Sequence, residues 1–271
     1  MGEATQETPH VDQLPSALGP ELADALEGRR PAVFLDYDGT LTPIVEHPDL
    51  ALLSEATRRA LQNLAGVCPI AVVSGRDRPD VAKKVGLGDI YYAGSHGFDI
   101  SGPDGFHEER GDEIRSVLEE AAAELEERTS RLDGVWLERK RYAVAVHFRR
   151  APSGVEEELE PLVRDVTSDR PQLRVSGGKK IFELRPALEW DKGKAVLWLR
   201  RVLGVAGDDY VTLYIGDDET DEDAFEVLRP EPNGLGIVVG ISHRPTYARL
   251  SLVDTEEVRL LLERIADMET G

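Results

Sequence analysis

Short apolar runs alternate with segments of helical spacing through most of the chain. The runs at residues 32–36 and 69–73 are each followed by an amphipathic segment, and a third run lies at 90–93. A continuous apolar run indicates a strand buried on both faces, and strands that alternate with helices are typical of a parallel sheet. The same pattern returns at 211–215 and 236–239. We therefore predict an α/β fold with a doubly wound, mostly parallel sheet.

The middle of the chain has a different pattern. We expect a long charged helix at 112–131, a hairpin with arms 135–138 and 142–149 joined by a turn at 139–141, a second helix at 154–167 and a strand pair around 177–178. In the second hairpin arm, apolar residues alternate with small and polar ones, which gives the sheet one apolar face. The pattern predicts an inserted α+β cap domain at 105–186, a core at 30–104 and 187–271, and an N-terminal tail with a short helix at 1–29.

Polar residues directly follow several of the predicted core strands. These residues are Asp36, Asp38, Ser74, Asp217, Asp218 and Asp221, and Lys192 opens a nearby helix. In open α/β sheets, ligands bind beyond the carboxyl ends of the strands. Several acids at one point would be destabilising without a cation, and carboxylates without a His–Cys pattern favour Mg²⁺ over zinc. The strand ends therefore predict a magnesium site.

Composition narrows the function further. The formal charge of −20 over 271 residues argues against binding to nucleic acid or to an anionic membrane, because both need a basic face. A phosphate substrate must therefore meet a local positive site. The single Cys68 suits a reducing compartment, the first ten residues do not form a signal peptide, and no apolar run approaches the roughly 20 residues of a membrane span. We expect a cytoplasmic protein.

The motifs resemble those of a known superfamily. A D-x-D-G-T segment, a later strand-end Ser, a Lys and G-D-D-x-x-D look like the haloacid dehalogenase superfamily of phosphatases. Among them, the chain is similar to the trehalose-6-phosphate phosphatases, in the segments "LDYDGTLTPIVEHPD", "VVSGRDRPDV", "AGSHGFDI", "WDKGKAV" and "YIGDDETDEDAF". The resemblance runs from about Pro31 to the C-terminus. It implies Mg²⁺-dependent hydrolysis of trehalose 6-phosphate to trehalose and phosphate.

The resemblance also implies a role for each strand-end residue. Asp36 would attack phosphorus and form an aspartyl-phosphate, and Asp38 would protonate the leaving sugar oxygen and then activate water. Mg²⁺ would bind the Asp36 carboxylate, the Asp38 main-chain carbonyl and Asp217. The remaining roles are metal-bound water for Asp218 and Asp221, a phosphoryl hydrogen bond for Ser74 and charge compensation for Lys192.

Residues of the inserted domain are expected to bind the sugar, because hydroxyl groups need carboxylates and multiple donors. The residues at matching positions are Glu138, Arg149 and Glu183, followed by Lys140, His147, Lys179 and Lys180. Arg76 and His96, on core loops, are expected to contact the phosphate or the adjacent sugar.

Several alternatives remain open from the sequence. Ser74 could be a helix cap, Lys194 rather than Lys192 could face the site, and Arg149 and His147 could be solvated surface residues. Sucrose phosphate or mannosylglycerate phosphate could replace trehalose 6-phosphate as substrate, and a phosphosugar mutase would use similar aspartates. A non-catalytic phosphate-sensing module is disfavoured because both Asp36 and Asp38 are present. We expect a separate trehalose-phosphate synthase to supply the substrate.

Overall fold

The chain folds as two compact units. The computed structural model describes residues 8–178 and 180–270. The first unit ends at Glu108 and resumes at Trp190, and the second unit is Glu109–Glu189. The sequence pattern placed the two boundaries after residues 104 and 186.

The first unit is built on an eight-stranded sheet with the order β12-β11-β10-β1-β2-β3-β4-β5. Neighbouring strands from β12 to β3 are parallel, and β4 is antiparallel to β3. The strands are β1 (Arg30–Leu35), β2 (Ile70–Val73), β3 (Tyr91–Gly94), β4 (Asp99–Ser101), β5 (His107–Glu109), β10 (Tyr210–Gly216), β11 (Gly234–Val239) and β12 (Leu250–Leu252). This topology confirms the predicted doubly wound α/β class.

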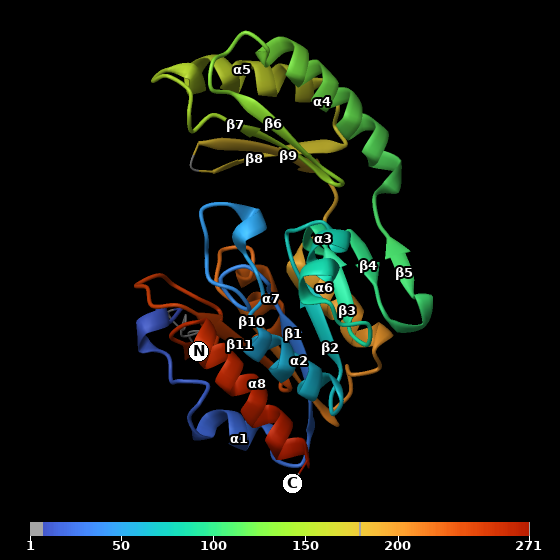
Figure 1. Ribbon diagram of the computed structural model, residues 1–271, viewed down its shortest axis with the longest axis vertical. Coiled ribbons are helices and arrows are strands. Elements are labelled where there is room, and N and C mark those ends of the chain that lie inside the picture. Colours follow the sequence, from blue (N-terminus) through green and yellow to red (C-terminus); the bar gives the residue numbers. More distant parts are fainter. Residues whose placement is uncertain (1–7, 179, 271) are drawn as a thin grey trace, which may run out of the picture. The chain divides into compact units, whose positions relative to one another are not determined.

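Helices cover both faces of this sheet (Figure 1). One face is packed by α1 (Pro20–Leu26), α2 (Glu55–Ala65), α3 (Arg78–Val85) and α8 (Thr255–Thr270), and the other by α6 (Lys192–Val202) and α7 (Glu222–Leu228). On β1, Val33 and Leu35 point into the first core, whereas Ala32 and Phe34 point into the second. This double burial explains why β1 is a continuous apolar run.

The described residues also form five short 3₁₀ helices, the last of them in the second unit. They are η1 (Val11–Gln13), η2 (Pro48–Leu50), η3 (Ser95–Gly97), η4 (Pro103–Gly105) and η5 (Asp112–Ile114). The sequence predicts a tail before the first helix. The described part of this segment instead contains the short helix η1. Val11 is buried in the second core, because the segment pairs with the loop that precedes β12. Residues 1–7 of the predicted tail lie outside the described residues.

The second unit is a four-stranded antiparallel sheet with two helices on one face. The strand order is β6-β7-β9-β8, and the elements are α4 (Arg115–Thr129), β6 (Trp136–Lys140), β7 (Ala143–His147), α5 (Val155–Ser168), β8 (Leu173–Gly178) and β9 (Ile181–Pro186). The predicted hairpin turn at 139–141 was wrong. Arg139 pairs with Val144 and Lys140 with Ala143, so the ladder continues and the chain turns only at residues 141–142.

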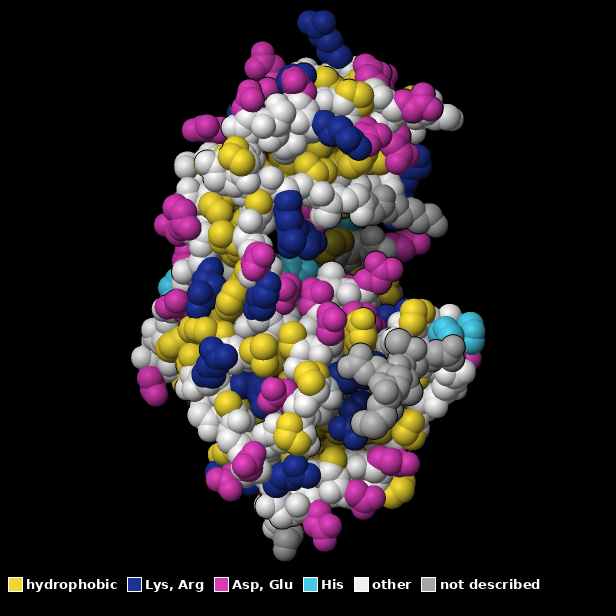
Figure 2. Space-filling model, turned by 180° about the vertical axis from the view of Figure 1, so that it is seen from behind, with side chains coloured by type: hydrophobic (Ala, Val, Ile, Leu, Met, Phe, Trp, Pro, Cys, Tyr) yellow, Lys and Arg dark blue, Asp and Glu magenta, His cyan; other side chains and the backbone are white. Residues whose placement is uncertain are grey.

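The described part of the chain contains no helix that is both long enough and apolar enough to cross a membrane. Acidic and basic side chains are interspersed on the face shown in Figure 2, where they form no continuous basic stripe.

Truncation of a buried helix residue should destabilise the first unit. Leu61 of α2 is fully buried in the first core. We expect Leu61→Ala to lower the free energy of unfolding by about 2–5 kcal/mol, because it leaves a cavity. The neighbouring exposed residue, Gln62, provides a control. Gln62→Ala should change the free energy of unfolding by less than about 0.5 kcal/mol. Urea unfolding followed by circular dichroism checks both, and equal effects would contradict the packing described here.

Candidate active site

Three neighbouring strands bring the predicted residues to one edge of the sheet. In the register of the central strands, Leu35 of β1 lies opposite Ile215 of β10 and Val72 of β2. Since all three strands run in the same direction, the residues that follow them emerge together. This edge carries Asp36 after β1, Ser74 after β2 and Asp217 after β10.

A buried lysine joins two of the carboxylates. Lys192 is the first residue of α6, and its side chain is only 2% exposed. Its Nζ lies 2.9 Å from Asp36 Oδ1 and 2.7 Å from Asp221 Oδ1. Lys194 instead is partly exposed and pairs with Asp191, the residue that caps the helix. The structure therefore favours Lys192 over Lys194 as the lysine of this site.

Asp221 is held by four donors. Its Oδ1 accepts from Lys192 and, at 2.6 Å, from the hydroxyl of Tyr214. Its Oδ2 accepts from the backbone N–H groups of Asp217 and Asp218, at 2.9 and 3.0 Å. A carboxylate offers about four lone-pair positions, so these donors occupy the acceptor capacity of Asp221. The residue thus orients both the lysine and the loop after β10.

The acidic residues have strongly perturbed pKa values. Burial raises the pKa of Asp36 well above its usual value, although Lys192 opposes this change. Burial, together with the charges of Asp221 and Asp218, raises the pKa of Asp217 to about 7. Burial also opposes ionisation of Asp218, but Lys192 and hydrogen bonds from Thr220 more than offset it and lower the pKa. Asp36 and Asp217 therefore lack sufficient positive charge nearby.

A divalent cation would supply that charge. Carboxylate oxygens of Asp36, Asp217 and Asp221 lie within 4.8 Å of one another. Oxygen donors of this kind are the ligands that hard cations prefer. The raised pKa values of Asp36 and Asp217 are those expected of acids grouped for a cation. The residues present therefore fit a metal such as Mg²⁺.

Two glycines allow the segments that follow β1 and β10 to approach each other closely. Gly39 has φ +78°, and a Cβ atom there would lie 2.0 Å from a carboxylate oxygen of Asp217. A Cβ atom at Gly216 would lie 2.2 Å from Cγ of Asp221. The glycines of the D-x-D-G-T and G-D-D motifs are thus needed to bring the aspartates together.

Asp38 forms a bidentate ion pair with Arg76. The Nε and Nη2 atoms of Arg76 lie 2.6 and 2.7 Å from the two carboxylate oxygens of Asp38. Arg76 also donates to Asp80 and to the carbonyl of Pro48. The sequence predicted that Arg76 would contact the substrate, and the structure places it on the predicted general acid–base.

Ser74 and His96 lie on adjacent loops. Ser74 is buried, and its Oγ accepts from the backbone N–H of Arg76 at 3.1 Å. The N–H of His96 donates to the carbonyl of Ser74, and the His96 ring lies where a Cβ atom of Gly75 would collide with it. The loops after β2 and β3 thus support each other at the carboxyl edge.

In the second unit, the sheet face opposite α4 and α5 carries a row of charged side chains. Glu138 of β6 and Glu183 of β9 both pair with Ala145 of β7, so the two carboxylates flank a small residue. Lys140 lies 3.2 Å from Glu183, and His147 lies 2.9 Å from Glu138. Four of the predicted sugar-binding residues therefore share one sheet face.

Two other predicted residues do not join this row. Lys180, whose backbone has φ +67°, donates to Glu156 of α5 at 2.8 Å, and its amine also lies near the Phe148 ring. Arg149 is exposed in the turn that follows β7. Lys179 lies outside the described residues.

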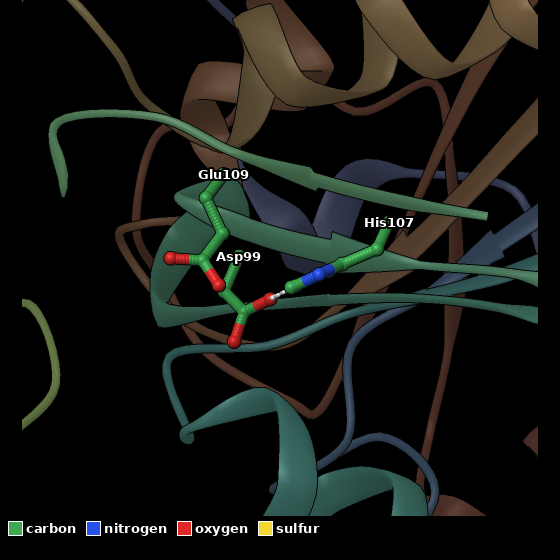
Figure 3. Close-up of side chains that lie close together, drawn as sticks. All are labelled: Asp99, His107 and Glu109. Carbon is green, nitrogen blue, oxygen red and sulfur yellow. Dashed lines mark hydrogen bonds and ion pairs between the residues drawn. The ribbon is translucent and has the colours of Figure 1, made fainter. Parts of the chain in front are cut away.

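A further buried acid lies at the edge of the first unit. Asp99 of β4 accepts from Arg78 of α3 at 2.7 Å, and His107 of β5 lies 2.9 Å away (Figure 3). Asp99 is completely buried. Because Arg78 already compensates its charge, this group ties α3 to β4 and has a structural role.

Comparisons with known proteins identify the fold and the family. A haloacid dehalogenase-like hydrolase from Bacteroides thetaiotaomicron shares the fold, with a TM-score of 0.62 and 18% identity over 88% of this chain and 99% of that one. The C-terminal domain of the trehalose-6-phosphate phosphatase of C. albicans aligns with a TM-score of 0.77 and 26% identity, over 94% of this chain and 99% of that one. The fold is thus that of the haloacid dehalogenase-like hydrolases.

A family model described as trehalose-phosphatase matches residues 34–256. The chain is also 46% identical over 263 residues to a protein named trehalose-phosphate phosphatase from Mycobacterium tuberculosis, which covers 94% of this chain and 66% of that protein. The chain thus spans just under two thirds of the length of that relative. It belongs to the trehalose-phosphatase family, which confirms the resemblance seen in the sequence.

Sequence reasoning missed Tyr214, the buried hydroxyl donor to Asp221. The available signal was a tyrosine in the mostly apolar strand β10, two residues before Gly216. A phenol in a strand buried on both faces needs a hydrogen-bond partner, and a strand-end acid could have been that partner.

Loss of the Tyr214 hydroxyl should destabilise the protein. We expect Tyr214→Phe to lower the free energy of unfolding by about 1–3 kcal/mol, because a buried carboxylate loses a donor. The control is Tyr210→Phe on the same strand, where the ring lies beneath Arg30 and the change should stay within about 0.5 kcal/mol. Thermal and urea unfolding measure both variants. Equal stability of Tyr214→Phe and wild type would contradict the described network.

The second unit should show a pH dependence that comes from Glu183. Burial opposes ionisation of Glu183, but Lys140 and Arg185 lower its pKa below the usual 4.5. Its stabilising effect is therefore present above pH 4.5 and is lost as the pH falls through the lower, folded-state pKa. Glu183→Gln should lower the melting temperature at pH 7, and the difference from wild type should disappear in acid.

The control for this pH series is Glu156→Gln, which alters an exposed pair with Lys180. We expect a small effect for this variant at every pH, because exposed pairs contribute little. Melting curves between pH 3 and 7 test the prediction. A constant difference between Glu183→Gln and wild type would refute it.

Proposed function

We propose that this protein hydrolyses trehalose 6-phosphate to trehalose and phosphate through an aspartyl-phosphate intermediate. The observation that carries the proposal is the Lys192 ammonium group, buried between Asp36 and Asp221 at the carboxyl edge of the sheet. It favours the ionised, nucleophilic form of a buried carboxylate at the position where this family's D-x-D-G-T motif begins, and the proposed cation would supply the remaining positive charge. The family membership and the mycobacterial relative's name support the substrate.

In the first half-reaction, an oxygen of Asp36 forms a bond to phosphorus while the bond from phosphorus to the sugar oxygen breaks. Asp38 gives its proton to that sugar oxygen. In the second half-reaction, Asp38 takes a proton from water, which attacks phosphorus and releases Asp36. Ser74 donates to a phosphoryl oxygen, and Lys192 compensates the negative charge.

Arg76 fixes the position of the Asp38 carboxylate. Its guanidinium group contacts both carboxylate oxygens in a bidentate pair. For one of these oxygens to reach the sugar oxygen or the attacking water, Asp38 must give up one of the two contacts. Arg76 therefore acts on the acid–base in this proposal, in addition to its predicted place near the phosphate together with His96.

The proposed cofactor is Mg²⁺, held by Asp36, Asp217 and the main-chain carbonyl of Asp38. When bound, the ion would polarise the phosphoryl group and offset its negative charge. Asp218 is the more exposed of the remaining acids and is proposed to hold metal-bound water. Asp221, with its four donors, is assigned to the orientation of Lys192 and the loop rather than to the water predicted from the sequence.

The second unit is proposed to recognise the sugar. Its charged row of Glu138, Lys140, His147 and Glu183 offers acceptors and donors for hydroxyl groups, and the Trp136 ring stacks on His147 at 4.0 Å. Arg149, Lys179 and Lys180 remain weaker candidates. A sugar other than trehalose, as in sucrose phosphate or mannosylglycerate phosphate, would require the same kinds of groups and is the alternative substrate class.

The proposal also covers the cellular location of the protein and the source of its substrate. We place the protein in the cytoplasm, which the buried, free Cys68 supports. A separate trehalose-phosphate synthase would supply the substrate.

Phosphate release from a panel of esters tests the proposal. The panel contains trehalose 6-phosphate, sucrose 6-phosphate, glucose 6-phosphate and mannosylglycerate phosphate, each with Mg²⁺ and with EDTA. We expect fast release from trehalose 6-phosphate alone, and EDTA should abolish it. Asp36→Asn should abolish turnover, and Asp38→Asn should lower kcat by about 10²- to 10⁴-fold because general acid–base catalysis is lost.

The matched control is Asp89→Asn, an exposed acid just before β3, which should retain activity. Release from a different ester would preserve the roles of Asp36 and Asp38 and overturn the sugar assignment. Full activity of Asp36→Asn would refute the mechanism.

Loss of one carboxylate in the charged row should weaken sugar binding. We expect Glu138→Gln to raise the KM for trehalose 6-phosphate by about 10- to 100-fold with a smaller change in kcat, because a charged acceptor for a hydroxyl is lost. Glu160→Gln, which alters an exposed pair with Arg164 on α5 of the same unit, should leave KM unchanged. Steady-state kinetics distinguish the two, and an unchanged KM for Glu138→Gln would remove this residue from the sugar site.

A further inference from the structure

Asp217 is held in place from two sides. Its N–H donates to Asp221, as described above, and its carbonyl accepts from Nη2 of Arg244 at 2.9 Å. Arg244 lies far along the chain, in the loop between β11 and β12. Both polar groups of the Asp217 backbone are therefore hydrogen-bonded by side chains.

Arg244 also anchors the start of α7. Its Nη1 lies 2.6 Å from Oε1 of Glu222, the first residue of that helix. The second oxygen of Glu222 accepts from the N–H of Tyr247 at 2.8 Å and from the hydroxyl of Thr246 at 3.2 Å. The loop that carries Arg244 is thus attached to both ends of the 217–222 segment.

The loop itself is fixed by the N-terminal segment. The carbonyl of Arg244 accepts from Val11 N–H, and Thr246 N–H donates to the carbonyl of Pro9, both at 3.0 Å. The rings of His10 and His243 stack at 4.2 Å. Val11 is buried in the second core. Arg244 therefore projects from a braced backbone and not from an unsupported loop.

This brace meets a physical need of the site. Asp217 lies among acids, close to Asp36 and Asp221, and their repulsion would displace its carboxylate in the absence of a cation. A backbone tied at N–H and carbonyl resists this displacement before the cation arrives. Residues that orient a metal ligand commonly change metal affinity by about 10- to 100-fold when they are replaced.

We propose that Arg244 is a positioning residue for the metal site, which holds Asp217 facing Asp36 through its contacts with the Asp217 carbonyl and Glu222. The proposal rests on the metal site of the proposed function and is independent of the sugar. Arg244 does not touch the substrate in this scheme.

Isothermal titration calorimetry with Mg²⁺ alone, without substrate, tests the proposal on the full chain. Arg244→Gln should weaken Mg²⁺ binding by about 10- to 100-fold, and Arg244→Lys should restore part of the loss by keeping one charged donor. Arg249→Gln removes the same charge from an exposed position in the same loop, and it should bind Mg²⁺ like wild type. In metal-free protein, the amides of Asp217 and Asp218 should exchange hydrogen faster in Arg244→Gln than in Arg249→Gln.

Each outcome decides a separate point. Wild-type affinity in folded Arg244→Gln would overturn the proposal and leave the proposed function intact. Absence of Mg²⁺ binding to wild type would refute the metal site itself and with it this inference. If Arg244→Gln does not fold, Glu222→Gln is the test, since it weakens the same tie. The Mg²⁺ affinity of Glu222→Gln should be lower than that of wild type, and an unchanged affinity would overturn the proposal.

Discussion

The Lys192 ammonium group, buried between two carboxylates, is the interaction on which the rest of the site depends. Removal of one partner from a buried ion group leaves an uncompensated charge, which is strongly destabilising. Asp36 and Asp221 therefore keep Lys192 charged, since their combined attraction outweighs the cost of burial and raises its pKa. In return, the ammonium opposes the tendency of burial to neutralise Asp36. Together with the proposed cation, this network would allow a buried carboxylate to act as a nucleophile.

The fold provides this arrangement through strand order. Placing β1 between β10 and β2 brings residues that are far apart in the chain to the same edge. Asp36, Ser74 and Asp217 need no specific contacts to reach that edge, because parallel register carries them there. The contacts then refine the geometry, through Tyr214 on Asp221 and through Arg244 on the Asp217 carbonyl.

Sequence analysis succeeded where periodicity and motif position decide the outcome. The continuous apolar run of β1 predicted a doubly covered strand, and the acids after β1 and β10 predicted a shared edge. It does not determine which contact a long side chain makes when several partners are near. Arg76 pairs with Asp38, and Lys180 pairs with Glu156, because local backbone angles and neighbouring acids direct them there. Arg244 belongs to no recognisable sequence motif, because its role depends on contacts with residues that are distant in the sequence.

The account is tested most directly by trapping the proposed covalent intermediate. The protein is mixed with trehalose 6-phosphate and Mg²⁺, quenched in acid and reduced with borohydride, which converts an acyl phosphate to an alcohol. Peptide mass spectrometry then locates the reduced residue. The account predicts reduction at Asp36 in wild type and none at Asp36 in Lys192→Met. Phosphate release by wild type without any reduction at Asp36, or with reduction at another acid, would contradict it.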